Sequence, residues 1–215
     1  MAFSGVLFLV LFAGGLLAAD MLATTSFPEA SRPFDEVVGY FLDNAGPVRV
    51  LSTCHAFAAM ALLVFSAYAG GVLRRTDSGE LGMVATAGGA VAAAMLLLDA
   101  ALFWTVASPS AAASPPLVEA LHDLSYICGG VALALPLGVF IACLAAAGAE
   151  RRLLPTWLRW VGAIAALGTV AYGTTLLAAE GAWSPSGVLV AGAVLPLLWI
   201  GAASLVLARS AARRP

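Results

Sequence analysis

Six stretches of largely apolar residues alternate with short polar segments along the chain. They cover residues 3–24, 48–73, 81–107, 117–147, 158–179 and 188–208. Each is long enough to span a membrane, because a helix needs about 20 apolar residues to cross a hydrocarbon core about 30 Å thick. The apolar positions are continuous rather than alternating, which favours helices over the strands of a barrel. We therefore expect an all-α bundle of six transmembrane helices, the fourth long enough to tilt or to begin as a turn at the membrane surface.

The segment between the first two stretches predicts one further, short helix. Pro33 suits the start of a helix, and Asp35 and Glu36 suit its first turn. Apolar residues recur at the spacing of an amphipathic helix, at Phe34, Val37, Val38, Phe41 and Leu42. We expect Gly46-Pro47 to end this helix. Two interpretations stay open: a helix lying on the outer membrane surface, or a lid over an outward-facing cavity.

The composition agrees with a membrane-embedded chain. Hydrophobic residues make up 62% of the 215 residues and charged residues only 10%, whereas a soluble domain carries about 25% charged residues. We treat residues 1–215 as a single integral membrane domain. The net charge of −2 and the lack of a basic stripe exclude nucleic acid as a main partner. The sequence contains no lysine, which excludes Schiff-base chemistry and a phosphate-binding P-loop.

The arginines indicate how the chain is threaded through the membrane. Six spans place Arg32 and Arg49 on one side. They place the other eight arginines on the opposite side: Arg74, Arg75, Arg151, Arg152, Arg159, Arg209, Arg213 and Arg214. Because arginine is enriched in cytoplasmic loops, we expect both termini in the cytoplasm and the chain in a bacterial cytoplasmic (inner) membrane. A cleaved signal peptide in place of the first span would leave five spans, but the stretch lacks a basic n-region.

Ionisable residues inside a membrane are energetically costly, so each indicates a function or a polar partner. Four lie in different predicted spans: Asp20, His55, Asp99 and His122, with Asp123 beside the last. At about 1.5 Å per residue, all four lie roughly 8–12 Å below the outer ends of their helices. Each of four helices is thus expected to place one polar side chain at the same depth in the membrane, which predicts an outward-facing polar pocket.

Two further side chains extend this predicted pocket. Arg49 lies on the same side of the second span as the histidine there, and Tyr126 shares a face of the fourth span with its histidine. We expect Arg49 to pair with Asp20 or Asp123 and to keep that carboxylate ionised. The candidate ligand-binding residues are His55, His122, Asp20, Asp99, Asp123, Arg49 and Tyr126.

Several interpretations of this set remain open. The residues could form a structural network that fixes helix register, a pocket for a ligand, lipid or ion, or the acid–base or metal site of an enzyme. A haem held between His55 and His122 is a further hypothesis. The candidate metal ligands are His55, His122, Asp20 and Asp99. No His-Glu-x-x-His, Gly-x-Ser-x-Gly or Cys-x-x-Cys motif occurs, so whether the protein is an enzyme stays open.

Parts of the chain resemble a group of bacterial integral membrane proteins classed as a domain of unknown function. The resembling segments are His122–Tyr126, Pro136–Gly138, Leu153–Gly162 and the loop Pro33–Arg49. The third of these is a basic turn followed by Leu-Pro-x-Trp-Leu-x-Trp and a glycine, which opens the fifth predicted span. The resemblance implies a six-helix integral membrane protein and assigns no activity or site residue.

The working hypothesis is a non-enzymatic membrane protein that binds a small ligand, lipid or ion in an outward-facing polar pocket. The first alternative is a metal- or haem-dependent membrane enzyme that uses the histidines and aspartates. The second is an accessory subunit that packs against a membrane partner, or against a second copy of itself, through glycine- and alanine-rich helix faces. The lipid bilayer is the partner that all three share.

Overall fold

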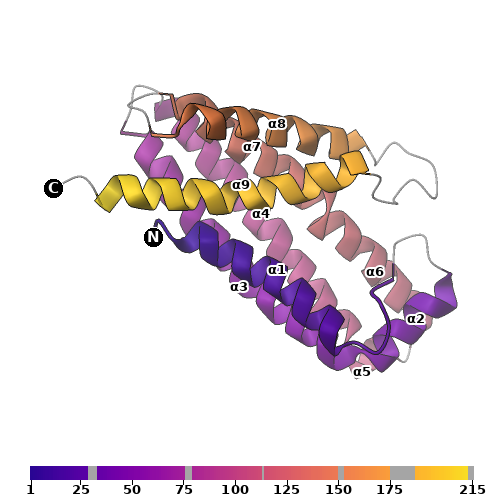
Figure 1. The fold of residues 1–215 in the computed structure, drawn as a ribbon. Coiled ribbons are helices and arrows are strands. Elements are labelled where there is room, and N and C mark those ends of the chain that lie inside the picture. Colours follow the sequence, from indigo (N-terminus) through magenta and orange to yellow (C-terminus); the bar gives the residue numbers. More distant parts are fainter. Residues whose placement is uncertain (29–32, 76–78, 113, 150–152, 175–186, 213–215) are drawn as a thin grey trace.

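The computed structural model describes residues 1–28, 33–75, 79–112, 114–149, 153–174 and 187–212, and these form helices and no strand. In chain order the helices are α1 (Ser4–Leu22), α2 (Phe34–Asp43), α3 (Ala45–Leu73), α4 (Gly79–Val106), α5 (Pro109–Ala112), α6 (Pro115–Gly129), α7 (Val131–Ala147), α8 (Thr156–Gly173) and α9 (Gly187–Ala212). The prediction of an all-α fold is thus confirmed. Figure 1 shows the start of α1 and the end of α9 at one end of the bundle, with α2, α5 and the start of α6 at the other.

Five segments of the described structure are long and apolar enough to cross a membrane. They are Ser4–Leu22, Ala45–Leu73, Gly79–Val106, Pro115–Ala147 and Gly192–Ala211. These five correspond to the first four and the sixth of the predicted spans. The fifth predicted span, residues 158–179, corresponds to α8, and its residues 175–179 lie outside the described part of the chain.

The long helices pack in chain order and close into a ring. α3 packs against α1 and α4, α4 against α7, α7 against α8, and α8 against α9. Contacts between α9 and α1 close the ring. Small residues permit the close approach, as at Gly88 of α4, where a Cβ atom would stand 2.8 Å from the carbonyl oxygen of Pro136 in α7.

α2 forms where the amphipathic pattern predicts a helix, but it ends earlier than expected. Pro33 directly precedes α2, and the buried face of the helix consists of Val37, Val38, Tyr40 and Phe41. The helix ends at Asp43 and α3 begins at Ala45, so Gly46 and Pro47 lie in the first turn of α3. A proline is tolerated there because first-turn N–H groups have no acceptor within their helix. The expectation that Gly46-Pro47 ends the helix was therefore wrong.

Asn44 joins three helices at the junction of α2 and α3. Its side chain is buried, and its Nδ2 group donates to the carbonyl oxygen of Tyr40 at 2.9 Å. Its Oδ1 atom accepts hydrogen bonds from the backbone N–H of Thr24, at 2.8 Å, and from the Thr24 hydroxyl, at 3.1 Å. One amide side chain therefore ties the segment after α1 to the junction between the next two helices.

The fourth apolar stretch is not one continuous helix. α6 ends at Gly129, α7 begins at Val131, and Gly130 between them has φ −95° and ψ −106°. A Cβ atom at Gly130 would overlap the carbonyl oxygen of Tyr126. Pro136 lies inside α7, so the interruption falls at Gly129-Gly130 and not at the proline. Non-helical backbone at membrane depth is tolerated where it is buried or lines a cavity.

Candidate functional site

His55 of α3 and Asp99 of α4 form a buried pair. His55 Nδ1 lies 2.8 Å from Asp99 Oδ2, and the two residues are 4% and 1% exposed. The donor of this hydrogen bond depends on the tautomer of the ring. With Asp99 ionised, Nδ1–H donates and Nε2 carries the free lone pair of the ring. Nε2 is buried and makes no hydrogen bond to any described residue. One ring nitrogen is thus held by the protein and the other is left for a partner.

Three neighbours fix the position of this pair. Phe12 of α1 stacks on the His55 ring, with ring centroids 4.7 Å apart and planes 7° from parallel. One helical turn before His55, the Ser52 hydroxyl donates to the carbonyl oxygen of Ala100 at 2.7 Å, a second polar link between α3 and α4. Gly129 at the end of α6 lies against the Asp99 carboxylate. The pair is therefore held by four helices.

His122 of α6 is buried separately, in a shell of aromatic rings. It is 1% exposed, and its ring lies 5.0 Å from that of Tyr126, 5.4 Å from that of Phe41 and 6.0 Å from that of Phe27, measured between centroids. Neither ring nitrogen has a hydrogen bond of good geometry to a described residue, although the backbone carbonyl of Pro28 lies near the ring. Nδ1 lies 3.8 Å from the Asp123 carboxylate.

The two histidines do not share a site. His122 contacts Phe27, Phe27 contacts Phe103 at 5.8 Å, and Phe103 contacts His55 at 6.2 Å, all between ring centroids. The hypothesis of a haem held between the histidines therefore has no support in this arrangement, because aromatic side chains occupy the space that the cofactor would need.

Asp20 does not join the predicted cluster. It is exposed on α1, and its carboxylate lies close enough to Tyr40 to act on that phenol. The pKa of Tyr40 is raised, first by burial and then by the negative charge of Asp20. The predicted equal depth was wrong for Asp20. Phe12 is the residue of α1 that lies level with His55, and Asp20 lies eight residues further along, close to the end of the helix at Leu22.

Arg49 and Asp123 also stand apart from the pair, and both are exposed. The Arg49 guanidinium donates to the carbonyl oxygen of Ala107 at 2.9 Å and lies 5.8 Å from the ring centre of Trp104. Among the described residues it forms no ion pair with Asp20 or Asp123, so the predicted pairing is wrong. Carbonyl oxygens at the C-terminal end of α4 offer the guanidinium an acceptor that the sequence pattern does not reveal.

The predicted set of four metal ligands is not assembled. Within the described ranges no group of three or more His, Cys, Asp or Glu side chains is placed to hold a metal ion. Of the four residues proposed from the sequence, the structure brings together His55 and Asp99 and leaves Asp20 and His122 elsewhere.

A cavity of about 250 Å³ lies beside the His55–Asp99 pair. Its walls are mostly aromatic and aliphatic, with contributions from Phe12, Leu16, Phe27, Leu51 and Phe103. Ser125, Tyr126 and Tyr172 add hydroxyl groups to the lining, and Gly129 and Gly130 form the part where the fourth stretch is interrupted. Tyr126, predicted from the sequence as a ligand-binding residue, therefore does line the cavity, whereas His122 does not.

A second cavity of about 260 Å³ adjoins the first between α1, α7 and α9. The two share Phe12, Leu16, Gly129, Gly130 and Tyr172 as lining residues. The far part of the second cavity is apolar and is lined by Leu133, Leu137 and Leu197 among others. The two cavities are therefore neighbours, and the His55–Asp99 pair lines only the first.

Sequence reasoning missed the aromatic and glycine residues of this site. Phe12 and Phe27 give no signal in a chain with 10 phenylalanines. The pair Gly129-Gly130 was visible as a small-residue pair, but such pairs recur in several spans and usually indicate only helix packing. Comparisons with models of protein families, with curated protein sequences and with solved structures find no match for this chain.

Proposed function

We propose that this chain is a multi-pass membrane protein whose cavity at His55 and Asp99 binds a small lipophilic molecule that carries a hydroxyl group. The observation that carries the proposal is the buried Nε2 atom of His55, which has no hydrogen-bond partner among the described residues, while the other ring nitrogen is held by Asp99. An unmade hydrogen bond at a buried polar atom is costly, so a ligand that supplies the missing partner gains binding energy.

The chemistry of the pair favours a donor group on the ligand. With Nδ1–H directed at the Asp99 carboxylate, Nε2 can only accept, and a hydroxyl of the ligand donates to it. When Asp99 is ionised, its negative charge strengthens Nε2 as an acceptor, as carboxylates hydrogen-bonded to metal-binding histidines do in other sites.

The shape of the space favours a lipophilic ligand with one polar end. The cavity beside His55 has apolar walls, and the adjoining cavity continues between α1, α7 and α9 with leucine side chains in its lining. Each is smaller than the roughly 300–1,000 Å³ of a drug-sized pocket. A ring with a short alkyl chain matches this shape, with the hydroxyl at His55 and the chain toward Leu197.

The proposed placement in the membrane has six spans, with α8 as the fifth, and puts both termini in the cytoplasm of a bacterial cell. The arginine distribution supports it, and α8 packs between α7 and α9 in the closed ring of long helices. In this orientation α2 lies on the outer side, and the His55–Asp99 pair lies in the outer half of the bundle.

A second candidate is a purely structural role for the pair, as expected of an accessory subunit. Two links favour it, since both His55–Asp99 and Ser52–Ala100 join α3 to α4. If the pair only links α3 to α4, the cavity need not bind a ligand. A measurement of ligand binding therefore distinguishes the two candidates.

The test is a thermal-shift titration of the detergent-purified protein with para-butylphenol and with its methyl ether. The phenol should raise the melting temperature, and the ether, which lacks the donor, should have a much smaller effect. His55→Phe should abolish the difference between the two compounds. His122→Phe is the matched control, because His122 does not line the cavity, and it should keep the difference. An equal response of the parent protein to both compounds, or none, would leave only the structural role.

A further inference from the structure

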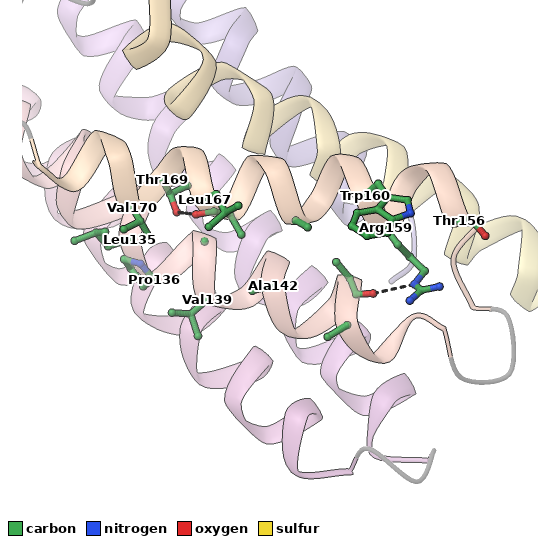
Figure 2. Close-up of a pocket in the computed structure, with 15 residues that line it drawn as sticks. Leu135, Pro136, Val139, Ala142, Thr156, Arg159, Trp160, Leu167, Thr169 and Val170 are labelled. Atoms are coloured by element: carbon green, nitrogen blue, oxygen red, sulfur yellow. Dashed lines mark hydrogen bonds between the residues drawn. The ribbon is translucent and has the colours of Figure 1, made fainter.

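A larger cavity lies between α7 and α8, and neither His55 nor Asp99 lines it. It is a groove of about 920 Å³ between the facing sides of these two helices (Figure 2). Along α7 it extends from Leu135 to Ala146, which at about 1.5 Å per residue is roughly 16 Å. This length is about half of a 30 Å hydrocarbon core, so the groove is as long as one leaflet is thick.

Small side chains keep the groove open. Ala142 of α7 and Ala163 of α8 line its middle, where larger residues would fill the space. At the rim, Leu167 is 70% exposed and Val170 is also exposed. The groove therefore opens away from the bundle, and in a membrane its open side faces lipid.

The one charged side chain among the lining residues of the groove, that of Arg159, lies at one end, whereas Thr169, whose hydroxyl donates to the carbonyl oxygen of Ala166, lies at the other (Figure 2). Thr156 and Trp160 lie at the same end as Arg159, and Leu135 and Val170 at the other (Figure 2). The Nε atom of Arg159 donates to the carbonyl oxygen of Ala145 at 3.2 Å, which holds the guanidinium at the mouth of the groove. Trp160 beside it is 69% exposed, as expected of a tryptophan in the headgroup region.

We infer that this groove binds one acyl chain of an anionic phospholipid, with the lipid phosphate on Arg159. The inference rests on the proposed membrane placement but not on any ligand at His55. An apolar channel of one-leaflet length with a cation at its mouth is complementary to a negatively charged headgroup and its chain, and guanidinium groups bind phosphate oxygens well. A helix of a second copy of the protein is a poorer occupant, because it would bury Arg159 against apolar surface.

Native mass spectrometry of the delipidated full chain tests this inference. The protein is titrated with dioleoyl phosphatidylglycerol and, separately, with dioleoyl phosphatidylcholine, which has the same chains and no net charge. We expect one tightly bound phosphatidylglycerol, held about tenfold more tightly than phosphatidylcholine. Both lipids carry the phosphate, but the positive choline group of the second is repelled by the Arg159 guanidinium.

Four variants locate the site. Arg159→Gln should lower the affinity for phosphatidylglycerol to that for phosphatidylcholine, and Arg159→Lys, which keeps the charge, should retain most of the preference. Ala142→Leu, at an exposed position, should fill the groove and weaken both lipids alike. Arg75→Gln is the control, because Arg75 is an exposed arginine that does not line the groove.

Equal binding of the two lipids by the parent protein would overturn the inference. So would an unchanged preference in Arg159→Gln, or a dimer that excludes lipid from the groove. If Arg159→Gln fails to fold, Ala142→Leu still decides the matter, because undiminished lipid binding by that folded variant would place the lipid elsewhere. None of these outcomes depends on the phenol titration, so the two proposals can fail separately.

Discussion

Asp99 of α4 lies so close to Gly129 of α6 that a Cβ atom at position 129 would stand 2.7 Å from Asp99 Oδ1 and 2.8 Å from Asp99 Cγ. The carboxylate that holds His55 thus packs directly against the backbone of Gly129, where α6 ends and the fourth apolar stretch is interrupted. A side chain at position 129 would collide with the Asp99 carboxylate, which explains the glycine there. The His55–Asp99 pair, the break between α6 and α7 and the cavity beside His55 therefore adjoin one another.

Gly129→Ala should therefore displace the Asp99 carboxylate and loosen its bond to His55. We expect a loss of about 1–3 kcal/mol of stability, the usual cost of an overpacked core position, together with a weaker thermal shift by para-butylphenol. Gly14→Ala is the matched control, because a Cβ atom there meets nothing within 4 Å. The control should be neutral or stabilised by up to about 1 kcal/mol. Equal melting temperatures for both variants would contradict this account.

His55 and Asp99 should be energetically coupled. In a double-mutant cycle with His55→Ala and Asp99→Ala, we expect a coupling of about 0.5–3 kcal/mol, as for residues in direct contact. Each single variant leaves a buried polar partner unpaired, so the double variant should cost less than the sum of the two. Denaturant unfolding in mixed micelles measures the four free energies. Additive effects would show that the pair contributes little beyond its separate contacts.

Asn44→Ala should destabilise the junction of α1, α2 and α3. The substitution removes the side-chain hydrogen bonds to Thr24 and Tyr40, at a cost of about 0.5–1.5 kcal/mol for each bond. The neighbouring exposed Asp43 provides the control, as Asp43→Ala should change the melting temperature little. The rate of amide hydrogen exchange around Thr24 should also rise in the Asn44 variant. An unchanged rate there would argue against a stabilising role for the hydrogen bonds between Asn44 and Thr24.

Phe27 should act as a wall of the cavity. Its ring contacts those of Tyr40, Phe41, Phe103 and His122, and it lines the space beside His55. Phe27→Ala should cost about 3–5 kcal/mol of stability and speed the release of para-butylphenol. Phe57→Ala is the comparison, because Phe57 is exposed on α3, and its loss should be small. Stopped-flow release measurements on both variants decide whether Phe27 contacts the ligand space.

The proposed threading predicts which positions are reached from outside the cell. In a cysteine-free background, Asp43→Cys at the end of α2 should react with a membrane-impermeant maleimide in intact spheroplasts. Arg75→Cys, after α3, should react only after permeabilisation, because it lies on the arginine-rich cytoplasmic side. The reverse pattern would invert the topology, and labelling of both positions from outside would contradict the assignment of α3 as a span.

The sequence alone determined the all-helical character, the positions of most helices and the separation of α2 from the long apolar stretches. These features depend on local composition, since about 20 apolar residues and an amphipathic spacing can be read without knowing any neighbour. The sequence also singled out His55 and Asp99 as costly intramembrane residues.

Tertiary structure alone decided which of the candidates meet. The sequence predicted similar depths for Asp20, His55, Asp99 and His122, but in the structure Phe12 rather than Asp20 is the α1 residue level with His55. Depth also says nothing of rotation about each helix axis, and that rotation is fixed by packing. It turns His55 and Asp99 toward each other, leaves Asp20 exposed and encloses His122 among aromatic rings. Three further features exist only between helices: the cavity beside His55, the groove of Figure 2 and the contact of Asp99 with Gly129. No single segment of the chain therefore encodes them.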